Sequence, residues 1–245
     1  MRNNRLYDAD PKNPDEFTRS FDRAYSRFAL RYDVAVKYLP VWKTWLRCAL
    51  PHIRGPHVLE VSFGTGYLLT QYAHRFETHG IDYNAAMVRT ARQNLARVGR
   101  VAHLCRSRVE ALPYADQSFD TVVNTMAFSG YPDSPQALAE MRRVLRPSGR
   151  VVLIDVNYPA DGNWIGTKLT DWAKRSGDLI RDLGSLFHDF DFVVTDNAIG
   201  GYGSVHLYIA EKAGDAVAPA GSSNGAQRCT FFSAHTPRSH VRIAP

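Results

Sequence analysis

Val58-Leu-Glu-Val-Ser-Phe-Gly-Thr-Gly66 is the stretch that decides the fold, because a short apolar strand runs directly into a glycine-containing turn. Glycines let the backbone approach a ligand closely, and the helix expected after the turn presents free N–H groups at its first residues. A strand, turn and helix of this kind can hold a nucleotide. The same turn can also serve packing alone, so the motif by itself leaves the function open.

Apolar strands and amphipathic helices alternate along the chain from residue 58 onward. The expected strands are 58–61, a strand ending at 82, 101–105, 119–126 and 151–156, and the expected helices follow the glycine turn to about residue 76, follow Asn84, and start at Ser134. This alternation predicts an α/β fold with a doubly wound, mostly parallel, Rossmann-like sheet, which binds ligands at the carboxyl ends of its strands. Residues 190–197 and 205–210, joined by a Gly-rich turn, predict a C-terminal antiparallel hairpin.

The chain divides into three parts. Residues 1–55 are expected to form an N-terminal arm and helical lid, with one amphipathic helix over 16–32 and a second over 34–50 that breaks or kinks at Pro40. Residues 56–212 form the main domain. Residues 213–245 are rich in Ala, Gly, Ser and Pro and are expected to be disordered.

The composition limits the class of protein. The 245 residues are 44% hydrophobic and 22% charged, which is typical of a globular enzyme, and no apolar run is long enough to cross a bilayer. The start has no apolar core, so no secretory signal is expected. Three widely spaced cysteines predict a reducing, cytoplasmic location with neither disulfides nor a zinc site, and no metal site is expected.

Positive charge is concentrated near the N-terminus. Of the formal net charge of +6, residues 1–55 carry most, with 11 Lys/Arg against 6 Asp/Glu. Arg19, Arg23, Arg27 and Arg31 repeat every four residues along the expected helix 16–32. This stripe is either a solvated helix face or a surface that attracts an anionic substrate or a membrane, so peripheral membrane contact through 16–32 stays open. No nucleic-acid partner is expected, and the oligomeric state is not specified.

Three further blocks follow the glycine turn in order. Asp82 lies at the end of the second strand, where a carboxylate can accept hydrogen bonds from both hydroxyls of a ribose. EALPYADQSFD (110–120) and EMRRVLRPSGR (140–150) each precede an expected strand. Together these blocks resemble the class I S-adenosylmethionine-dependent methyltransferases, in the branch that includes the ubiquinone/menaquinone C-methyltransferases.

The resemblance implies S-adenosyl-L-methionine as cofactor and assigns roles at the matching positions. Glu60 would orient the amino end of the methionine moiety, Asp82 would hold the ribose hydroxyls, and Tyr83 and Met87 would flank the adenine. The residues so assigned to cofactor binding are Glu60, Gly64, Gly66, Asp82, Tyr83, Met87, Val109, Glu110 and Asn124.

Two residues depart from the family pattern. Ser62 stands where the family has the first glycine of the turn, which would cost roughly 1 kcal/mol if the backbone there is left-handed. Arg108 stands where the family usually has an aspartate that accepts a hydrogen bond from the adenine amino group, and an arginine cannot accept one.

Methyl transfer from a sulfonium is an in-line displacement that mainly requires alignment, so no catalytic triad is expected. Tyr131, Asp155 and His206 are the candidate catalytic residues, and Trp164 and Trp172 are expected in the core of a lid or along an apolar pocket. The sequence therefore predicts methyl transfer to a small-molecule or lipid-like acceptor. The alternatives are a peripheral-membrane lipid or quinone methyltransferase, a cofactor-binding pseudoenzyme, and a nicotinamide oxidoreductase, which the missing third glycine of GxGxxG disfavours.

Overall fold

The computed structural model describes residues 7–20 and 40–212. The strands in this part of the chain are β1 His57–Val61, β2 Glu77–Asp82, β3 His103–Arg106, β4 Phe119–Thr125, β5 Leu145–Val156, β6 Phe192–Gly200 and β7 Val205–Lys212. The helices are α2 Pro40–Arg47, α3 Leu69–Tyr72, α4 Ala85–Arg97, α5 Ser134–Val144, α6 Trp164–Arg175 and α7 Leu183–Asp189, with short 3-10 turns η1 Leu50–His52, η2 Phe128–Gly130 and η3 Gly201–Gly203.

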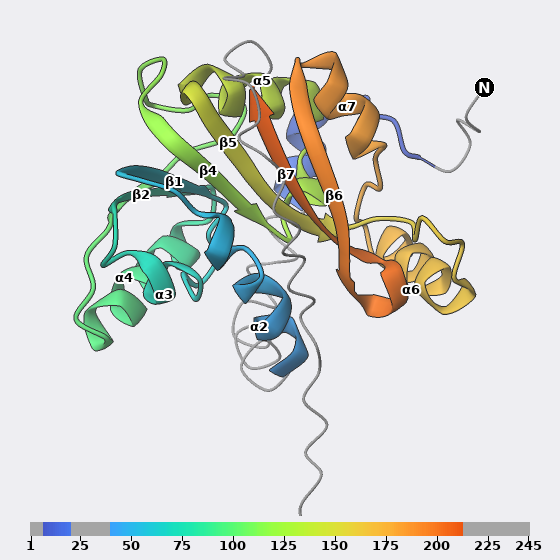
Figure 1. Cartoon of the computed structure of the whole chain (residues 1–245), viewed down its shortest axis with the longest axis horizontal. Helices are drawn as coiled ribbons and strands as arrows, with labels where there is room; N and C mark the ends of the chain where they lie inside the picture. The colour runs from blue at the N-terminus through green and yellow to red at the C-terminus, as the bar shows by residue number, and fades with distance from the viewer. Residues whose placement is uncertain (1–6, 21–39, 213–245) are drawn as a thin grey trace, which may run out of the picture.

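These strands form one sheet in the order β3-β2-β1-β4-β5-β7-β6 (Figure 1). The pairs from β3 to β5 are parallel, and β7 pairs antiparallel with both β5 and β6. The predicted fold, a doubly wound Rossmann-like sheet with a C-terminal antiparallel hairpin, is confirmed. The strands alternate with helices because each buried apolar strand is followed by a turn and an amphipathic segment.

Helices cover both faces of the sheet and create two cores. On one face Leu138 and Met141 of α5 pack with Phe187 of α7. On the other face Leu69 of α3 and Leu95 of α4 pack with the apolar residues that follow α2. Figure 1 shows α3 and α4 below the sheet and α5 and α7 above it. In the centre of the sheet, residues 58–61, 122–123 and 151–154 are buried from both sides and nearly all are apolar, whereas the edge strands β3 and β6 carry polar and exposed residues.

The chain order changes direction at β1, which lies between β2 and β4. Val61 at the end of β1 is level with Ile81 in β2 and with Asn124 in β4. The carboxyl ends of these three strands therefore meet at one edge of the sheet, which is the edge at which sheets of this class bind ligands.

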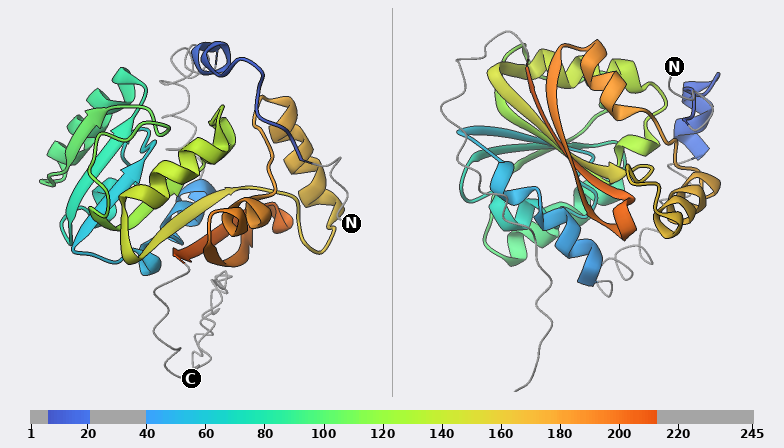
Figure 2. Two further views of the ribbon diagram at one scale, coloured as in Figure 1. Left: turned by 90° about the horizontal axis from the view of Figure 1, so that it is seen from above. Right: turned by 45° about the vertical axis from the view of Figure 1, so that its right-hand side comes forward.

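The N-terminal residues 7–13, here called the arm, run beside residues 179–181. The Asp8 backbone N–H donates to the Ile180 carbonyl at 2.7 Å, and Figure 2 shows the arm passing α6 before residues 14–20 turn into a helix. Of the helix expected over 16–32, residues 21–32 lie outside the described part, and so do residues 34–39 of the second expected helix and the expected tail 213–245.

Two expectations about helices were wrong. The helix expected from the glycine turn to about residue 76 is present but shorter: α3 spans Leu69–Tyr72, and turns occupy residues 67–68 and 73–74 on either side of it. Trp164 and Trp172 are not in the core of a lid: they lie on the solvent side of α6. No helix within 7–20 and 40–212 has both the length and the apolar character that crossing a membrane requires.

Candidate functional site

A cavity opens at the edge where β1, β2 and β4 end. Its walls are the glycine turn after β1, the end of β2 with the start of α4, the loop 107–110, and the chain from Thr125 to Pro132. The sequence-predicted residues on these walls are Glu60, Gly64, Asp82, Tyr83, Met87, Val109, Glu110 and Tyr131. Seven of the nine residues assigned to cofactor binding are thus brought together around one space.

Asp82 fixes the glycine turn through both of its carboxylate oxygens. Oδ2 accepts a hydrogen bond from the Gly64 N–H at 2.8 Å, and Oδ1 accepts one from the Asn84 N–H at 2.8 Å. Gly64 has φ of 57°, in the left-handed region. The Asp82 carboxylate therefore lies at the glycine turn and on the cavity wall, where the sequence predicted a ribose-binding acid.

Gly66 is not on the cavity wall but supports it from behind. Its φ is 73°, and a Cβ there would lie 2.8 Å from the Ala91 Cβ of α4. Glycine is therefore required for close packing of α4 against the turn. Gly66 thus supports the glycine turn without contributing to the surface of the cavity.

Ser62 has φ of 55°, so the strain expected at this departure from the family pattern is present. Its hydroxyl is part of a directed chain of hydrogen bonds. Asn124 Nδ2 donates one hydrogen to the Val61 carbonyl at 3.2 Å and the other to the Tyr131 hydroxyl at 2.6 Å. Tyr131 in turn donates to Ser62 Oγ at 2.8 Å. Because Ser62 Oγ accepts here, its own proton is left for an acceptor in the cavity.

Glu60 lies at the cavity wall and is almost completely buried. Burial raises the pKa of its carboxyl to about 8, a hydrogen bond from the Tyr72 hydroxyl at 2.8 Å opposes this, and the charge of Asp82 adds to it. Without a cation beside it, the carboxyl is therefore mostly protonated at neutral pH. A positively charged ligand group would favour its ionised form.

Arg108 does not take the part of the family's acid, which accepts a hydrogen bond from the adenine amino group; its side chain makes other contacts. Its guanidinium donates to Asp15 Oδ1 at 2.9 Å and to Thr18 Oγ1 at 3.1 Å, and it lies over the Tyr83 ring, 5.7 Å from the centroid. Asp15 and Thr18 belong to the helical residues 14–20, and Thr18 reaches the cavity wall. Arg108 thus holds this N-terminal helix beside the cavity. The two residues of the ion pair are 93 positions apart in the sequence, and the contact was not predicted from the sequence.

The predicted catalytic residues are not brought together. Tyr131 lines the cavity, whereas Asp155 and His206 are not among its lining residues. Asp155 accepts hydrogen bonds from the Ser129 N–H at 2.8 Å and hydroxyl at 3.3 Å, and burial, with Asp178 nearby, raises its pKa to about 7. His206 Nδ1 lies 2.8 Å from Asp196 Oδ1. Both residues are buried elsewhere in the fold.

Asn124, which the resemblance assigned to the cofactor, is also absent from the cavity wall. The side chain is fully buried at the end of β4. It acts on the wall only through its hydrogen bond to the Tyr131 hydroxyl. Its role in this structure is therefore to position a wall residue.

Part of the cavity lining is apolar. It comes from α2 and from the chain after β4, and its residues are Trp42, Leu46, Met126, Ala127 and Pro132. No sequence motif marked these residues, because an apolar residue at the end of a strand or on a helix does not distinguish a pocket from a core. Within 7–20 and 40–212 no group of three His, Cys, Asp or Glu side chains is placed to hold a metal ion.

Comparison with known proteins agrees with this geometry. Residues 59–153 match the family model of the methyltransferase domain. The chain is 34% identical over 135 residues to the phosphatidylethanolamine N-methyltransferase of Cereibacter sphaeroides, covering 54% of this chain and 66% of that protein. It is 31% identical over 171 residues to the demethylmenaquinone methyltransferase of Renibacterium salmoninarum, covering 67% and 68%. The chain thus spans about two thirds of the length of these relatives.

The solved structures extend the likeness to the fold. A geranyl diphosphate methyltransferase, determined in complex with GPP and sinefungin, superposes with a TM-score of 0.59 at 14% identity, over 70% of this chain and 77% of that one. At this identity the match concerns the fold alone.

Proposed function

Because the chain belongs to the S-adenosylmethionine-dependent methyltransferases, we propose that it transfers the methyl group of S-adenosylmethionine to a small, lipid-like acceptor. One observation carries the proposal. The cavity is lined both by the Glu60 and Asp82 carboxylates and by apolar side chains, among them Trp42, Leu46 and Met126. The carboxylates suit a cationic nucleoside, and the apolar side chains suit an apolar acceptor.

The residues around the turn fit this nucleoside. Asp82 presents a carboxylate at the cavity wall that can accept hydrogen bonds from ribose hydroxyls, and Met87 and Val109 offer buried apolar surfaces for the adenine beside the Tyr83 ring. Glu60 faces the place of the methionine amino group. Gly64 lies on the cavity wall in the left-handed region and has no Cβ, which leaves room for a ligand to cross the turn.

S-adenosylmethionine supplies a methyl group that is already activated by the positive sulfur. The protein's contribution is therefore alignment and exclusion of water. Burial raises the pKa of the Tyr131 hydroxyl well above its usual range, so the phenol stays protonated. This supports a role for Tyr131 in positioning Ser62 and the cavity wall, and argues against its acting as a general base. Asp155 and His206 are then structural residues.

The proposed class of acceptor is inferred from the apolar side chains that line the cavity and from the acceptors for which the relatives are named. Both curated relatives are named for acceptors with long apolar portions, a phospholipid and a demethylmenaquinone. We propose an acceptor of the same general character, with residues 56–212 as the catalytic domain and the N-terminal residues 1–55 as the arm and lid. The reducing, cytoplasmic location and the absence of a nucleic-acid partner stay predictions.

Isothermal calorimetry with S-adenosylmethionine tests the first half of the proposal. A panel of phospholipids and isoprenoid quinones, with production of S-adenosylhomocysteine as the readout, tests the second. Binding together with turnover of an apolar acceptor supports the proposal. Binding without turnover of any acceptor in the panel would favour the cofactor-binding pseudoenzyme, and absence of binding would reject both.

A further inference from the structure

Helix α6 is built with its large apolar side chains toward solvent. Gly166, Thr170 and Ala173 form its buried face. Trp164 and Trp172 are 65% and 68% exposed, and Leu169 is also exposed. An ordinary surface helix has the opposite arrangement, with apolar residues inward and polar residues outward. The outer face of α6 therefore carries more apolar surface than the face that packs on the protein, and such a patch marks an interaction site.

Basic side chains lie within the same exposed face. Lys168 lies with its Nζ 5.0 Å from the centroid of the Trp164 ring, and Arg175 is exposed in the last turn. At 3.6 residues per turn, Trp164, Lys168, Trp172 and Arg175 fall within about 80° of arc. Neither Lys168 nor Arg175 has an ion-pair partner in the part of the chain that the structure describes. We call this set, with Leu169, the tryptophan face.

Polar contacts of Thr170 on the inner side of α6, and of Asp171 at the edge of the tryptophan face next to Trp164, hold the tryptophan face outward. Thr170 Oγ1 donates to the Asn157 carbonyl at 2.8 Å, and the Tyr158 hydroxyl donates to Asp171 at 3.0 Å. A Cβ at Gly166 would lie 2.3 Å from the Tyr202 carbonyl oxygen, so the helix sits directly against η3. Turning the tryptophans inward would break these contacts, because the small residues that allow them would move to the solvent side.

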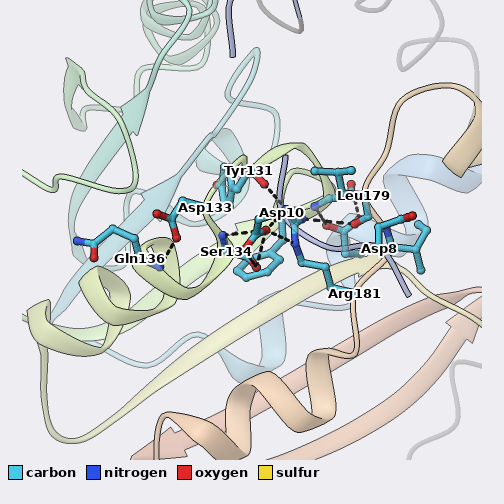
Figure 3. Close-up of polar contacts among 12 residues, drawn as sticks. Asp8, Asp10, Tyr131, Asp133, Ser134, Gln136, Leu179 and Arg181 are labelled. Carbon is cyan, nitrogen blue, oxygen red and sulfur yellow. Dashed lines mark hydrogen bonds and ion pairs between the residues drawn. The ribbon is translucent and has the colours of Figure 1, made fainter. Parts of the chain in front are cut away.

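The arm connects this helix to the cavity. Lys174 of α6 pairs with Asp8 at 2.9 Å, and Asp10 pairs with Arg181 at 2.6 Å and accepts a hydrogen bond from the Ser134 hydroxyl at 3.1 Å (Figure 3). The chain then continues into residues 14–20, whose Thr18 lines the cavity. Both views of Figure 2 place α6 and residues 14–20 on the same side of the molecule.

We propose that the tryptophan face docks the protein on the surface of a bilayer that contains anionic lipid. Tryptophan prefers the boundary between the hydrocarbon and the headgroups, and lysine and arginine next to it attract anionic headgroups. The combination of the two on one rigid helix favours a lipid surface over a protein partner. The proposal is independent of methyl transfer, since docking requires neither cofactor nor turnover.

Flotation with vesicles of phosphatidylcholine, with and without phosphatidylglycerol, tests the proposal on the full chain. We expect the wild type to float with the phosphatidylglycerol vesicles. The Trp164→Ala/Trp172→Ala variant should partition at least about tenfold more weakly, because even partial burial of an aromatic ring is worth that much. The Lys168→Glu/Arg175→Glu variant should bind the phosphatidylglycerol vesicles more than about twentyfold more weakly than the wild type, because each basic residue near an anionic surface raises the affinity about fivefold.

The matched control is Arg89→Glu/Arg97→Glu, which makes the same charge change on exposed positions of α4, at the other end of the sheet (Figure 1). Unchanged melting temperatures show that all variants fold. Equal flotation of the wild type and the tryptophan variant would overturn the proposal. So would a wild-type dimer in light scattering that dissociates in the tryptophan variant, because the face would then be covered by a second copy of the chain.

Tryptophan fluorescence gives an independent readout. On phosphatidylglycerol vesicles the emission should shift to shorter wavelength and be quenched by lipids brominated on their acyl chains, and the Trp164→Phe/Trp172→Phe variant should lose both effects. The remaining tryptophans, Trp42 and Trp45, lie next to the cavity and serve as the internal background. Signals that persist in that variant would overturn the assignment, because another part of the protein would then contact the lipid.

Discussion

Replacing Glu60 with glutamine is expected to make the protein more stable at neutral pH and at the same time a weaker binder of S-adenosylmethionine. In the absence of ligand, burial raises the pKa of the Glu60 carboxyl to about 8 from an ordinary value of 4.5. Glutamine has nearly the same shape and keeps an oxygen that can accept the hydrogen bond from Tyr72. It removes the titrating group and leaves the packing intact.

The sign of the stability effect follows from proton linkage. The folded protein binds the Glu60 proton more tightly than the unfolded chain, so this group favours folding at low pH and the benefit fades as the pH rises from 4.5 toward 8. With these two pKa values the wild type loses about 2.5 kcal/mol between pH 5 and pH 7 through Glu60 alone. The variant does not lose it. For a chain of this size the gap in melting temperature should therefore widen by about 5–10 °C over that interval.

Melting curves of the two proteins at pH 5, 6 and 7, without ligand, measure the difference. Asp155, whose pKa is also raised by burial, to about 7, is present in both proteins and cancels in the comparison. Glu16→Gln, on the exposed part of residues 14–20, is the matched control, and its melting temperature should follow that of the wild type across the pH range. The same behaviour in Glu60→Gln would refute the assignment of a buried, protonated carboxyl.

Calorimetry measures the opposite effect on the ligand. The methionine amino group would lose a charged acceptor, which is worth about 1.5–3 kcal/mol, or about ten- to a hundredfold in affinity. Higher stability with unchanged affinity would show that Glu60 is buried for packing and does not face the ligand. Lower stability would contradict the pKa argument itself.

Five further changes test other parts of the site and the C-terminal tail. Asp82→Ala should weaken binding of S-adenosylmethionine more than tenfold in calorimetry, since a charged hydrogen-bond acceptor is worth roughly 1.5–3 kcal/mol. Ser62→Ala, which keeps the left-handed strain, and Tyr131→Phe both remove the hydrogen bond from Tyr131 to Ser62, and Tyr131→Phe also removes the one from Asn124. Both should therefore raise the KM for the cofactor a few-fold, Tyr131→Phe at least as much as Ser62→Ala, and an effect of Ser62→Ala alone would contradict the directed chain. Arg108→Ala should speed proteolytic cleavage near residues 14–20 and raise that KM a few-fold, because a half-exposed ion pair contributes at most about 1 kcal/mol. Deleting 213–245 should leave melting temperature and turnover nearly unchanged, and a large loss in either would place the tail in the fold.

The sequence predicted the parts of the site that depend on local chain geometry. The strand and turn at 58–66 and the cap at Asn84 follow from neighbouring residues, and Asn84 Oδ1 does accept from the N–H groups of Ala86 and Met87. Asp82 lies at the end of a predicted strand beside the turn, so parallel pairing alone brings it to Gly64. Such contacts need only the period of the pattern and the topology of the sheet.

Other features depend on partners far away in the chain. Nothing in the neighbourhood of Arg108 indicates that Asp15 is its partner, because the two meet only after the arm has folded across the molecule. The orientation of α6 could not be predicted either. The periodicity of Trp164, Lys168 and Trp172 defines one face of a helix, but periodicity does not say whether that face turns toward the protein or toward solvent.

Ser62, the first departure from the family pattern, is connected to the arm through Tyr131. The Tyr131 hydroxyl donates to Ser62 Oγ, and the Tyr131 backbone carbonyl accepts a hydrogen bond from Arg181 at 2.5 Å. The same guanidinium pairs with Asp10 of the arm. A continuous set of polar contacts therefore runs from the glycine turn to the N-terminal residues.

Arg108, the second departure, bonds to the residues that directly follow the arm. Its guanidinium pairs with Asp15, two residues beyond the end of the arm, and donates a further hydrogen bond to Thr18 in the same helix. The contacts of both departures thus lead to the same N-terminal segment, residues 7–20.

At each departure the family residue is replaced by one that makes a new contact. Ser62 accepts a hydrogen bond from Tyr131, whose backbone carbonyl bonds to the Arg181 that pairs with the arm, and Arg108 bonds directly to Asp15 and Thr18. A glycine in place of Ser62 would leave the Tyr131 hydroxyl without this acceptor but would relieve the left-handed strain, whereas an acid in place of Arg108 would repel the Asp15 carboxylate that now pairs with it. Since Arg181 is buried and bonds both to Asp10 and to the Tyr131 carbonyl, loss of the arm would leave a buried charge without its carboxylate. Restoring the family's acid at position 108 alone would therefore weaken the attachment of residues 14–20 beside the cavity.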